Sequence, residues 1–431
     1  MLDTSHRPSV ARTKSRIGNT IRVGFFLANR QIRSSVGTSV LVITVMVLTY
    51  LNLLVVSGVM VGIVQGLRNE NQARYSGDLI ISNLDTKNSI QNSPDVQAYL
   101  RGLPTVSNFS ARYLAPGTIE GNYAGRLTSQ DKMDTFTTTI AGIDPLAEDT
   151  MTGLSHLVIE GQYLQSDDYD QVLLGTSLLA RYKALTAIPG ATPIPNVGVG
   201  SRVRILIGNV EREMTVKGVV ASKIEGINLR AFMVDSQMRL MLGRTDDSVN
   251  EIAVKLARGA DVQTVEHQLQ QSFVGSYAKI QSEPESEPAF MQDFSATFSQ
   301  LGSFLGSIGL VVAFIVIFIL VLINTIVHRR SIGILQAVGI QSAGIELGYV
   351  VQSVLYAIIG AAIGMAIVFG VLVPFFNAHP INFPFSNGIL TVTFADSFSK
   401  ALILVLSIVL ASYVPARIIL RQEIVDSILG R

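Results

Sequence analysis

The sequence predicts a membrane protein with four transmembrane α-helices and a large α+β extracytoplasmic domain inserted between helices 1 and 2. Three observations predict this fold class. Of the 431 residues, 48 % are hydrophobic and only 15 % are charged, whereas soluble domains carry about 25 % charged residues. The charges are almost absent from four separate windows. The long stretch between the first two windows has the mixed pattern of a folded domain.

The four apolar windows define the predicted membrane spans. With their apolar flanks they predict transmembrane helices at 36–67, 298–327, 350–373 and 400–420. Each has the length of roughly 20 residues or more that is needed to cross a bilayer. The first window is too long for the apolar region of a signal peptide and follows a polar segment, so we expect it to remain as an anchor.

The distribution of basic residues predicts the orientation. The segment 1–35 carries seven Lys or Arg against one acidic residue, which places it in the cytoplasm. Four spans then define the remaining segments: 68–297 and 374–399 outside, 328–349 and 421–431 inside. The short loops agree, because Arg329 and Arg330 lie in the first inside loop, whereas 374–399 has no Lys or Arg.

The segment 68–297 has the pattern of a folded domain. In "RVRILIG" (202–208) apolar and polar residues alternate, which predicts a half-buried strand. In "SPDVQAYLRGLP" (93–104) we expect a helix with Ser93 as its N-cap and the following proline at its first position. Strands interspersed with helices over about 230 residues predict an α+β domain. The polar tract 282–288 is expected to join it to the second span.

Charge and motifs exclude several classes of function. Residues 36–297 carry 20 basic and 27 acidic side chains, a net charge of −7, and therefore lack the basic face of a nucleic-acid-binding protein. The sequence contains no G-x-x-x-x-G-K-[ST] phosphate loop, no G-x-S-x-G and no H-E-x-x-H. There are no cysteines, and the five histidines have no ligand spacing. We predict no catalytic residues, no metal and no cofactor bound by this chain.

Two clusters of residues favour structural roles. The acidic residues within 167–170 are typical of a solvated loop, and a metal or catalytic role is the minority interpretation. Met233, Met238 and Met241 are interpreted as core residues that fill gaps, because methionine is flexible and apolar. Contact with a substrate is the alternative for these methionines.

The predicted spans contain glycines at four-residue spacing in place of charges. Their interiors have no Asp, Glu, Lys or Arg, which weighs against an ion-coupled carrier. Gly302 and Gly306 form one glycine pair, and Gly360 and Gly364 form another. Glycines at this spacing allow close approach of helix backbones. The partner helix lies either within this chain or in a second membrane subunit, and the sequence leaves both open.

The inside loop 328–349 carries a helical pattern of its own. Ile332, Leu335 and Val338 recur at helical spacing, and Gly339 follows where a helix is expected to stop. The pattern predicts about two turns with one apolar stripe. Such a helix either lies on the lipid headgroups or docks into a groove of a cytoplasmic partner.

The loop also carries a family resemblance. "HRRSIGILQAVGI" resembles the R-R-x-E-I-G-I-L-[RK]-A-[LIV]-G segment of FtsX/MacB-type (type VII) ABC transporter permeases, a group that includes the lipoprotein-releasing LolC and LolE. The segments 70–82 and 140–164 resemble parts of their extracytoplasmic domain, and 415–429 resembles their terminal tail. The chain departs from the family at Ser331, where the family often has Glu, and at Gln336, where it often has Arg or Lys.

The resemblance implies a non-catalytic permease subunit in the bacterial cytoplasmic (inner) membrane, with both termini in the cytoplasm and 298–431 as the FtsX-like permease domain. It implies a cytoplasmic ABC ATPase dimer that binds ATP and Mg, and a second permease subunit, as a homodimer or a LolC/LolE-like heterodimer. It also implies contact with membrane lipids and with a periplasmic carrier or adaptor. The family's ATPase-coupling helix corresponds to Arg329, Arg330, Ile332, Gly333, Leu335, Ala337, Val338 and Gly339.

Two functions are compatible with this resemblance. In the first, the chain extracts or extrudes amphipathic cargo such as a lipoprotein, a lipid or a hydrophobic compound. In the second, it is an FtsX-like transmitter whose partner ATPase activates a cell-wall hydrolase across the membrane. The large domain of about 230 residues favours the first, because this is the size found in the MacB and LolC/LolE branches.

Overall fold

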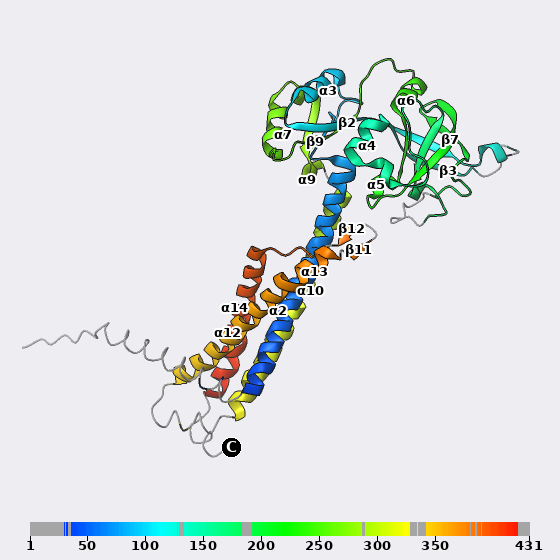
Figure 1. Ribbon diagram of the computed structural model, residues 1–431. Coiled ribbons are helices and arrows are strands. Elements are labelled where there is room, and N and C mark those ends of the chain that lie inside the picture. Colours follow the sequence, from blue (N-terminus) through cyan, green and yellow to red (C-terminus); the bar gives the residue numbers. More distant parts are fainter. Residues whose placement is uncertain are drawn as a thin grey trace, which may run out of the picture. The chain divides into compact units, whose positions relative to one another are not determined.

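The computed structural model divides into two compact units (Figure 1). We name them the helical unit (1–63, 295–381 and 388–431) and the sheet unit (64–294 and 382–387). The structure describes residues 30, 32, 36–126, 128, 133–182, 192–286, 289–327, 334, 342–379, 381–383, 386–388 and 390–420. Each unit is described by itself.

Four long helices contribute to the helical unit: α2 (Val36–Asn71), α10 (Ala289–Val327), α12 (Ser342–Ile367) and α14 (Phe394–Leu420). Through the π-helical turn η5 (Val368–Leu372), α12 continues into α13 (Val373–Ala378). The short strands β11 (Ile381–Phe383) and β12 (Ser386–Gly388) pair with each other. In the described residues, four helices are long and apolar enough to cross a membrane. The predicted number of spans is confirmed.

All four helices extend beyond the apolar windows that predicted them, most of all at the start of α10 and of α12. α10 begins at Ala289 and α12 at Ser342, whereas the windows begin at 298 and 350. The polar tract 282–288 also holds a helical turn, α9 (Glu283–Ser286). Hydropathy marks only the part of a helix that matches the hydrocarbon layer, while the backbone hydrogen bonds of a helix continue through polar residues.

The core of the helical unit is made by buried side chains from all four helices. On α2, Met46, Tyr50 and Leu54 are fully buried at successive turns. On α10, Ile317 joins this core, and Ile408 does so on α14. The spacing of four residues along α2 keeps these side chains on one face.

The sheet unit is built on one large sheet with the strand order β10-β1-β9-β2-β3-β8-β5-β7-β4, in which β6 pairs with both β2 and β7. The strands are β1 (Leu79–Asn83), β2 (Val106–Glu120), β3 (Thr135–Ile143), β4 (Val158–Gly161), β5 (Gln171–Gly175), β6 (Arg202–Ile207), β7 (Val210–Val220), β8 (Arg230–Val234), β9 (Glu251–Leu256) and β10 (Ala278–Ser282). The helices are α3 (Ser93–Gly102), α4 (Pro145–Thr152), α5 (Glu225–Asn228), α6 (Asp235–Met241), α7 (Val262–Gln271), α8 (Val274–Tyr277) and α9, with short turns η1 (Gln72–Ser76), η2 (Tyr123–Gly125), η3 (Leu154–Leu157) and η4 (Thr176–Leu178).

The long strand β2 joins the two halves of this sheet. Its first half pairs with β9, and its second half pairs with β3 and β6. Arg112 stands at the change of partner, opposite Glu251 on β9 and opposite Ile143 on β3. One apolar core lies against β1, β9 and β10 under α3 and α7, and another lies among β3, β5, β6, β7 and β8. Arg112 is therefore at the centre of the sheet unit.

Several local predictions for this unit can be compared with the structure. The alternation in β6 is confirmed, because Val203, Ile205 and Ile207 are buried. The N-cap prediction for α3 is wrong: the N-cap is Asn92, in a left-handed conformation. The Ser93 hydroxyl instead donates to the carbonyl of Ile90 and accepts from a backbone N–H of a distant segment. A tertiary contact has replaced the local one.

The two clusters with predicted structural roles occupy different environments. Met233, Met238 and Met241 are buried in the apolar core of the sheet unit, which fits the core interpretation. The acidic residues are more ordered than a solvated loop would be. Asp168 forms an ion pair with Lys217, and Asp170 binds Arg212. These two ion pairs attach the loop that precedes β5 to the neighbouring strand β7.

Candidate functional site

The predicted ATPase-coupling residues lie outside the described residues: Arg329, Arg330, Ile332, Gly333, Leu335, Ala337, Val338 and Gly339. Within the segment, Ile334 is described and its side chain is exposed. The chain that follows the segment is described from Ser342, where α12 begins. Ile345 and Tyr349, in the first turns of α12, are buried in the core of the helical unit. The residues next to the predicted coupling helix are therefore firmly packed.

Gly360 and Gly364 place α12 in direct contact with α2. A Cβ atom at Gly360 would lie 2.5 Å from the Cβ of Met46, and one at Gly364 would lie 2.7 Å from Cδ1 of Tyr50. Real Cβ atoms do not approach other carbons so closely. These two glycines face a helix of the same chain, so the contact needs no second subunit.

The other predicted pair lies on α10 and is less uniform. A Cβ atom at Gly302 would lie 3.0 Å from the Cβ of Met60, whereas at Gly306 the nearest atom is a methyl carbon 3.9 Å away. A third glycine, Gly309, was not predicted. Its Cβ would lie 2.5 Å from Oδ1 of Asn52. Gly306 therefore has room for a side chain. The close contact between α10 and α2 is made one turn later, at Gly309.

Gly58 in the middle of α2 is a second glycine that the sequence analysis missed. The segment before α14 lies against it: Thr391 N–H donates to the Gly58 carbonyl at 3.1 Å, and a Cβ would lie 2.6 Å from Cγ2 of Val392. The sequence does carry a signal for it, because Gly62 and Gly66 follow Gly58 at four-residue spacing. This is the same spacing as in the two predicted glycine pairs, and it favours close approach of a neighbouring segment.

Buried hydrogen bonds add polar contacts between the helices of this unit. The hydroxyl groups of Ser39 on α2 and Tyr356 on α12 lie 2.7 Å apart, and within α12 Gln352 supports this contact by donating to Tyr356 at 2.9 Å. Tyr50 donates to the carbonyl of Ser397 at 2.8 Å. Bonds of this kind between membrane helices contribute about 0.6–2 kcal/mol each. Together with the glycines they tie α2 to α12 and to α14.

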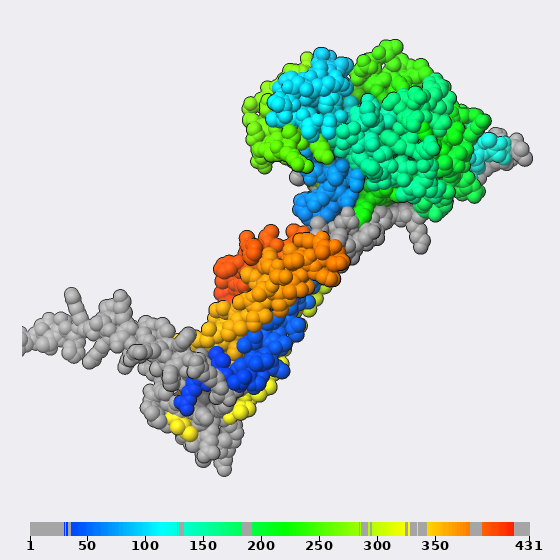
Figure 2. Space-filling model, viewed as in Figure 1, coloured from blue at the N-terminus to red at the C-terminus, as the bar shows by residue number. Residues whose placement is uncertain are grey.

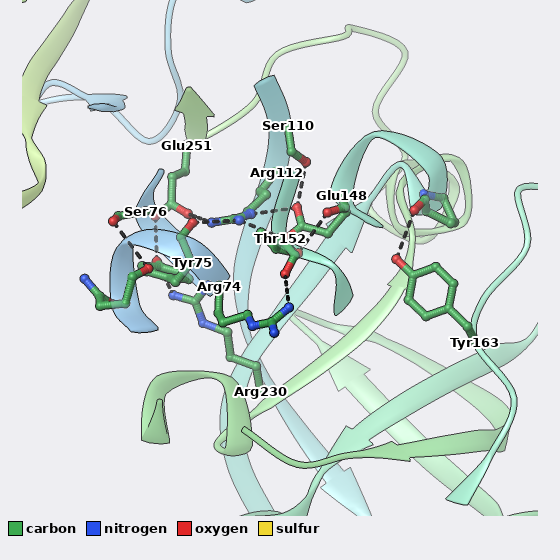
Figure 3. Close-up of polar contacts among 12 residues, drawn as sticks. Arg74, Tyr75, Ser76, Ser110, Arg112, Glu148, Thr152, Tyr163, Arg230 and Glu251 are labelled. Carbon is green, nitrogen blue, oxygen red and sulfur yellow. Dashed lines mark hydrogen bonds and ion pairs between the residues drawn. The ribbon is translucent and has the colours of Figure 1, made fainter. Parts of the chain in front are cut away.

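A buried ion network lies in the sheet unit around Arg112 (Figure 3). The guanidinium donates from Nε and Nη2 to the two carboxylate oxygens of Glu148 on α4, both at 2.8 Å. From Nη1 it donates to Oε1 of Glu251 on β9, also at 2.8 Å. Ser110 donates a further hydrogen bond to Glu148 at 2.6 Å. Arg112 is 1 % exposed and Glu148 3 %.

The same network holds the π-helical turn η1, which follows directly on α2. Arg112 Nη2 donates to the Tyr75 carbonyl at 2.9 Å, and the Tyr75 hydroxyl donates to Glu251 at 2.8 Å. Arg230 on β8 donates to the Tyr75 hydroxyl at 2.7 Å. The guanidinium carbons of Arg112 and Arg230 lie 4.9 and 4.6 Å from the centre of the Tyr75 ring. Tyr75 is thus clamped between two cations.

The network is stable as an ionised set. Burial alone would lower the pKa of Arg112, but the carboxylates of Glu148 and Glu251 outweigh it and raise this pKa above its usual value. Burial would raise the pKa of Glu251, but Arg112 and Arg230 together lower it. Buried charges are tolerated where each has a partner at hydrogen-bond distance. The two arginines and two glutamates meet this condition.

Sequence reasoning missed this network entirely. The partners of Arg112 lie 36 and 139 residues away along the chain, and no spacing rule connects them. One signal is an arginine inside the apolar alternation of β2, because a charge at a buried strand position needs a partner. In the described residues, no group of three or more His, Cys, Asp or Glu is arranged to hold a metal ion.

Comparison with known proteins gives two family matches. The model of the MacB-like periplasmic core domain matches residues 54–272, just over half of the chain. The model of the FtsX-like permease C-terminal region matches residues 303–424. No curated protein matches the chain.

Two solved structures are also similar. One is the periplasmic region of MacB from Actinobacillus actinomycetemcomitans, at 15 % identity and a TM-score of 0.32, over 48 % of this chain and 90 % of that one. The other is the extracellular domain of the noncanonic ABC-type transporter YknZ from Gram-positive bacteria, at 14 % identity and a TM-score of 0.30, over 47 % of this chain and 98 % of that one. By its two family matches the chain belongs to the MacB/FtsX-like family of ABC transporter permeases.

Proposed function

We propose that this chain is the permease subunit of a transporter in the bacterial inner membrane and that a separate cytoplasmic ATPase dimer, with ATP and Mg, drives it. Its cargo is an amphipathic molecule, such as a lipoprotein, a lipid or a hydrophobic compound, taken from the outer leaflet or the periplasm. The chain itself binds no cofactor and catalyses no reaction. Its termini lie in the cytoplasm, as the basic segment 1–35 suggests.

The observation that carries this proposal is the way α2 is held along its length. Within the helical unit, Gly360 and Gly364 bring α12 against it. Beyond Asn71 the chain enters η1, where Tyr75 is fixed by Arg112 in the buried ion network. A continuous helix of 36 residues is stiff enough to transmit a displacement from one end to the other. We infer that α2 transmits displacements along its axis from the helical unit to the sheet unit.

The proposed sequence of events follows from these contacts. Closure of the ATPase dimer displaces the proposed coupling helix within 328–349, and the chain leads on from there into α12, which begins at Ser342. The displacement passes to α2 through Gly360 and Gly364, and at its far end through Tyr75 to the strands of the sheet unit. The sheet unit then moves the cargo or presents it to a periplasmic carrier or adaptor. Binding of ATP by one chain thus changes the conformation of another.

Two features support cargo handling outside the membrane. The interiors of the spans carry no charged residues, so they offer no polar path for a solute. The extracytoplasmic domain makes up about half of the chain. The permease is proposed to act as a pair, either as a homodimer or with a sister subunit as in LolC/LolE.

Isolation of the complex from native membranes tests the proposal. We expect the tagged chain to co-purify with an ABC ATPase, and the reconstituted complex to release amphipathic cargo only when ATP is hydrolysed. A catalytically inactive ATPase, which still binds ATP, is the matched control. If the isolated complex contains no ATPase, the proposal is wrong. If it contains a peptidoglycan hydrolase that becomes active on ATP hydrolysis and no cargo moves, the signalling function replaces transport.

A further inference from the structure

A groove of about 730 Å³ opens on the sheet unit and plays no part in the proposed transmission of force. Its lining comes from the first half of β2, from α3, α4 and the start of α6, and from the segment 247–249. In Figure 2 the cyan surface of the α3 region lies beside the blue-green surface of the α4 region. A volume of 300–1,000 Å³ is typical of ligand sites.

The floor of the groove is an open strand edge. β9 pairs with β2 from Val106 to Arg112. On the other side of β2, the pairing with β3 begins only at Arg112, opposite Ile143. The chain then leaves the sheet at Pro145, the first residue of α4. Among the described strands, none pairs with this side of β2 from Val106 to Ala111. The open edge is roughly 20 Å long at 3.3 Å per residue, and open edges bind extended chains.

Two charges at this groove are left for a ligand. Arg101, in the last turn of α3, lies over the ring of Phe109 at 5.5 Å and has no carboxylate within ion-pair distance in the described part of the chain. Asp247 lies near the start of α3, because Val249 N–H donates to Ser93 Oγ at 3.1 Å. It too has no basic partner among the described residues. Eight residues of helix separate the two ends by about 12 Å.

The other charged side chains of the lining already have partners. Arg239 donates to Asp235 at 3.0 Å, and Asp144 accepts from two N–H groups at the start of α4. The apolar part of the lining includes Phe109 and Leu146, and Leu146 is 74 % exposed. The groove therefore offers an apolar wall, a strand edge, one cation and one anion.

We propose that this groove binds an extended peptide segment of a partner protein as an added strand on β2, with an acidic side chain at Arg101 and a basic side chain at Asp247. Strand addition takes its affinity from main-chain hydrogen bonds and its specificity from alternate side chains. At 3.3 Å per residue, about four residues span the 12 Å between the two charges. The acidic and basic side chains then lie four positions apart on one face of the peptide. This inference does not depend on ATP-driven transport.

Selection of linear decapeptides by phage display, with the full-length protein in lipid nanodiscs and empty nanodiscs for counter-selection, provides the probes. We expect enriched peptides with alternating apolar residues and opposite charges four positions apart. Their binding is measured by fluorescence anisotropy. Hydrogen exchange is expected to slow at amides within 106–111 when the peptide is bound. No enrichment, or enrichment without this protection, overturns the proposal.

A charge exchange provides the second test with the same peptides. Arg101→Glu is expected to weaken binding about tenfold or more, and replacing the acidic residue of the peptide by lysine is expected to restore it. Asp247→Lys should respond in the same way to an acidic residue in place of the basic one. Arg258→Glu changes an exposed arginine outside the groove and serves as the matched control. The proposal is contradicted if peptide affinity is unchanged by the charge substitutions at both Arg101 and Asp247. It is also contradicted if an apolar dye binds in the groove but no peptide does.

Discussion

Arg112 and Glu148 are joined by two parallel hydrogen bonds of 2.8 Å, from Nε to Oε2 and from Nη2 to Oε1. Their side chains are only 2 % and 4 % exposed. Paired hydrogen bonds of this kind fix the angle between the two groups as well as their distance. The contact therefore sets the position of α4 on β2. Through the same guanidinium it also sets the position of Tyr75.

Replacement of this arginine should destabilise the sheet unit. Arg112→Met is expected to lower its free energy of unfolding by about 3–5 kcal/mol, because Glu148 is left buried without a cation and Glu251 keeps only Arg230. Arg181→Ala is the control, since Arg181 pairs with Glu160 where both side chains are 42 % exposed; such pairs contribute at most about 1 kcal/mol. Hydrogen exchange of sheet-unit peptides in the full-length protein measures both changes. Equal effects of the two variants would show that the buried network adds no stability.

The same network predicts a loss of stability in acid. The pKa of Glu251 is lower in the folded protein than its ordinary value of 4.5, because Arg112 and Arg230 outweigh the effect of burial. The ionised carboxylate thus contributes stability above about pH 4.5, and this contribution is lost as the pH falls through the lower folded pKa.

The corresponding measurement follows the free energy of unfolding from pH 7 to pH 3. We expect Glu251→Gln to be less stable than the unmodified chain at pH 7 and to lose less stability on acidification. Glu211→Gln, at a side chain that is 57 % exposed, should keep the original slope. If the slope of the Glu251→Gln variant is unchanged, protonation of Glu251 is not the cause of the acid sensitivity.

The contact between α12 and α2 predicts different effects of alanine at different glycines. Gly360→Ala places a Cβ 2.5 Å from the Cβ of Met46, so the helices must separate, at a cost of about 1–3 kcal/mol. Gly370→Ala meets no atom within 4 Å and is the matched control. The unfolding temperatures of the two variants in detergent are compared by heating each protein and measuring the remaining folded fraction by size-exclusion chromatography. The close packing is refuted if Gly360→Ala unfolds at the same temperature as the control.

The coupling loop predicts a variant that inserts normally and loses its partner. Leu335→Asp puts a charge on the apolar stripe of the loop, and burial of an unpaired carboxylate in a partner groove is unfavourable by several kcal/mol. We expect co-purification of the ATPase to fall more than tenfold. Ser342→Asp adds the same charge at the start of α12, where a helix N-terminus tolerates it. A Leu335→Asp protein that retains its ATPase would place the docking surface elsewhere.

The sequence determined the class of this protein through features that act locally. Runs of apolar residues predicted the four spans, because the bilayer sets a minimum length for a transmembrane helix. Counting consecutive apolar residues is enough to test whether a segment reaches that length. The alternation in β6 predicted a strand with Val203 and Ile205 on its buried face, which the structure confirms. The absence of a phosphate loop predicted that a separate chain binds the ATP, and this stays a prediction. Each of these conclusions depends on neighbours within about 30 residues.

The tertiary structure decided which distant residues meet. The glycine spacing of 360 and 364 indicated close packing, but only the fold identified Met46 and Tyr50 as the residues they contact. The network of Arg112 had no signal beyond a charge in an apolar strand, because its partners come from α4 and β9. The open edge of β2 depends on where β3 stops pairing, which the turn at Pro145 sets. Local patterns specify elements, while contacts between charges and between backbones depend on the register of strands and helices that are far apart in the chain.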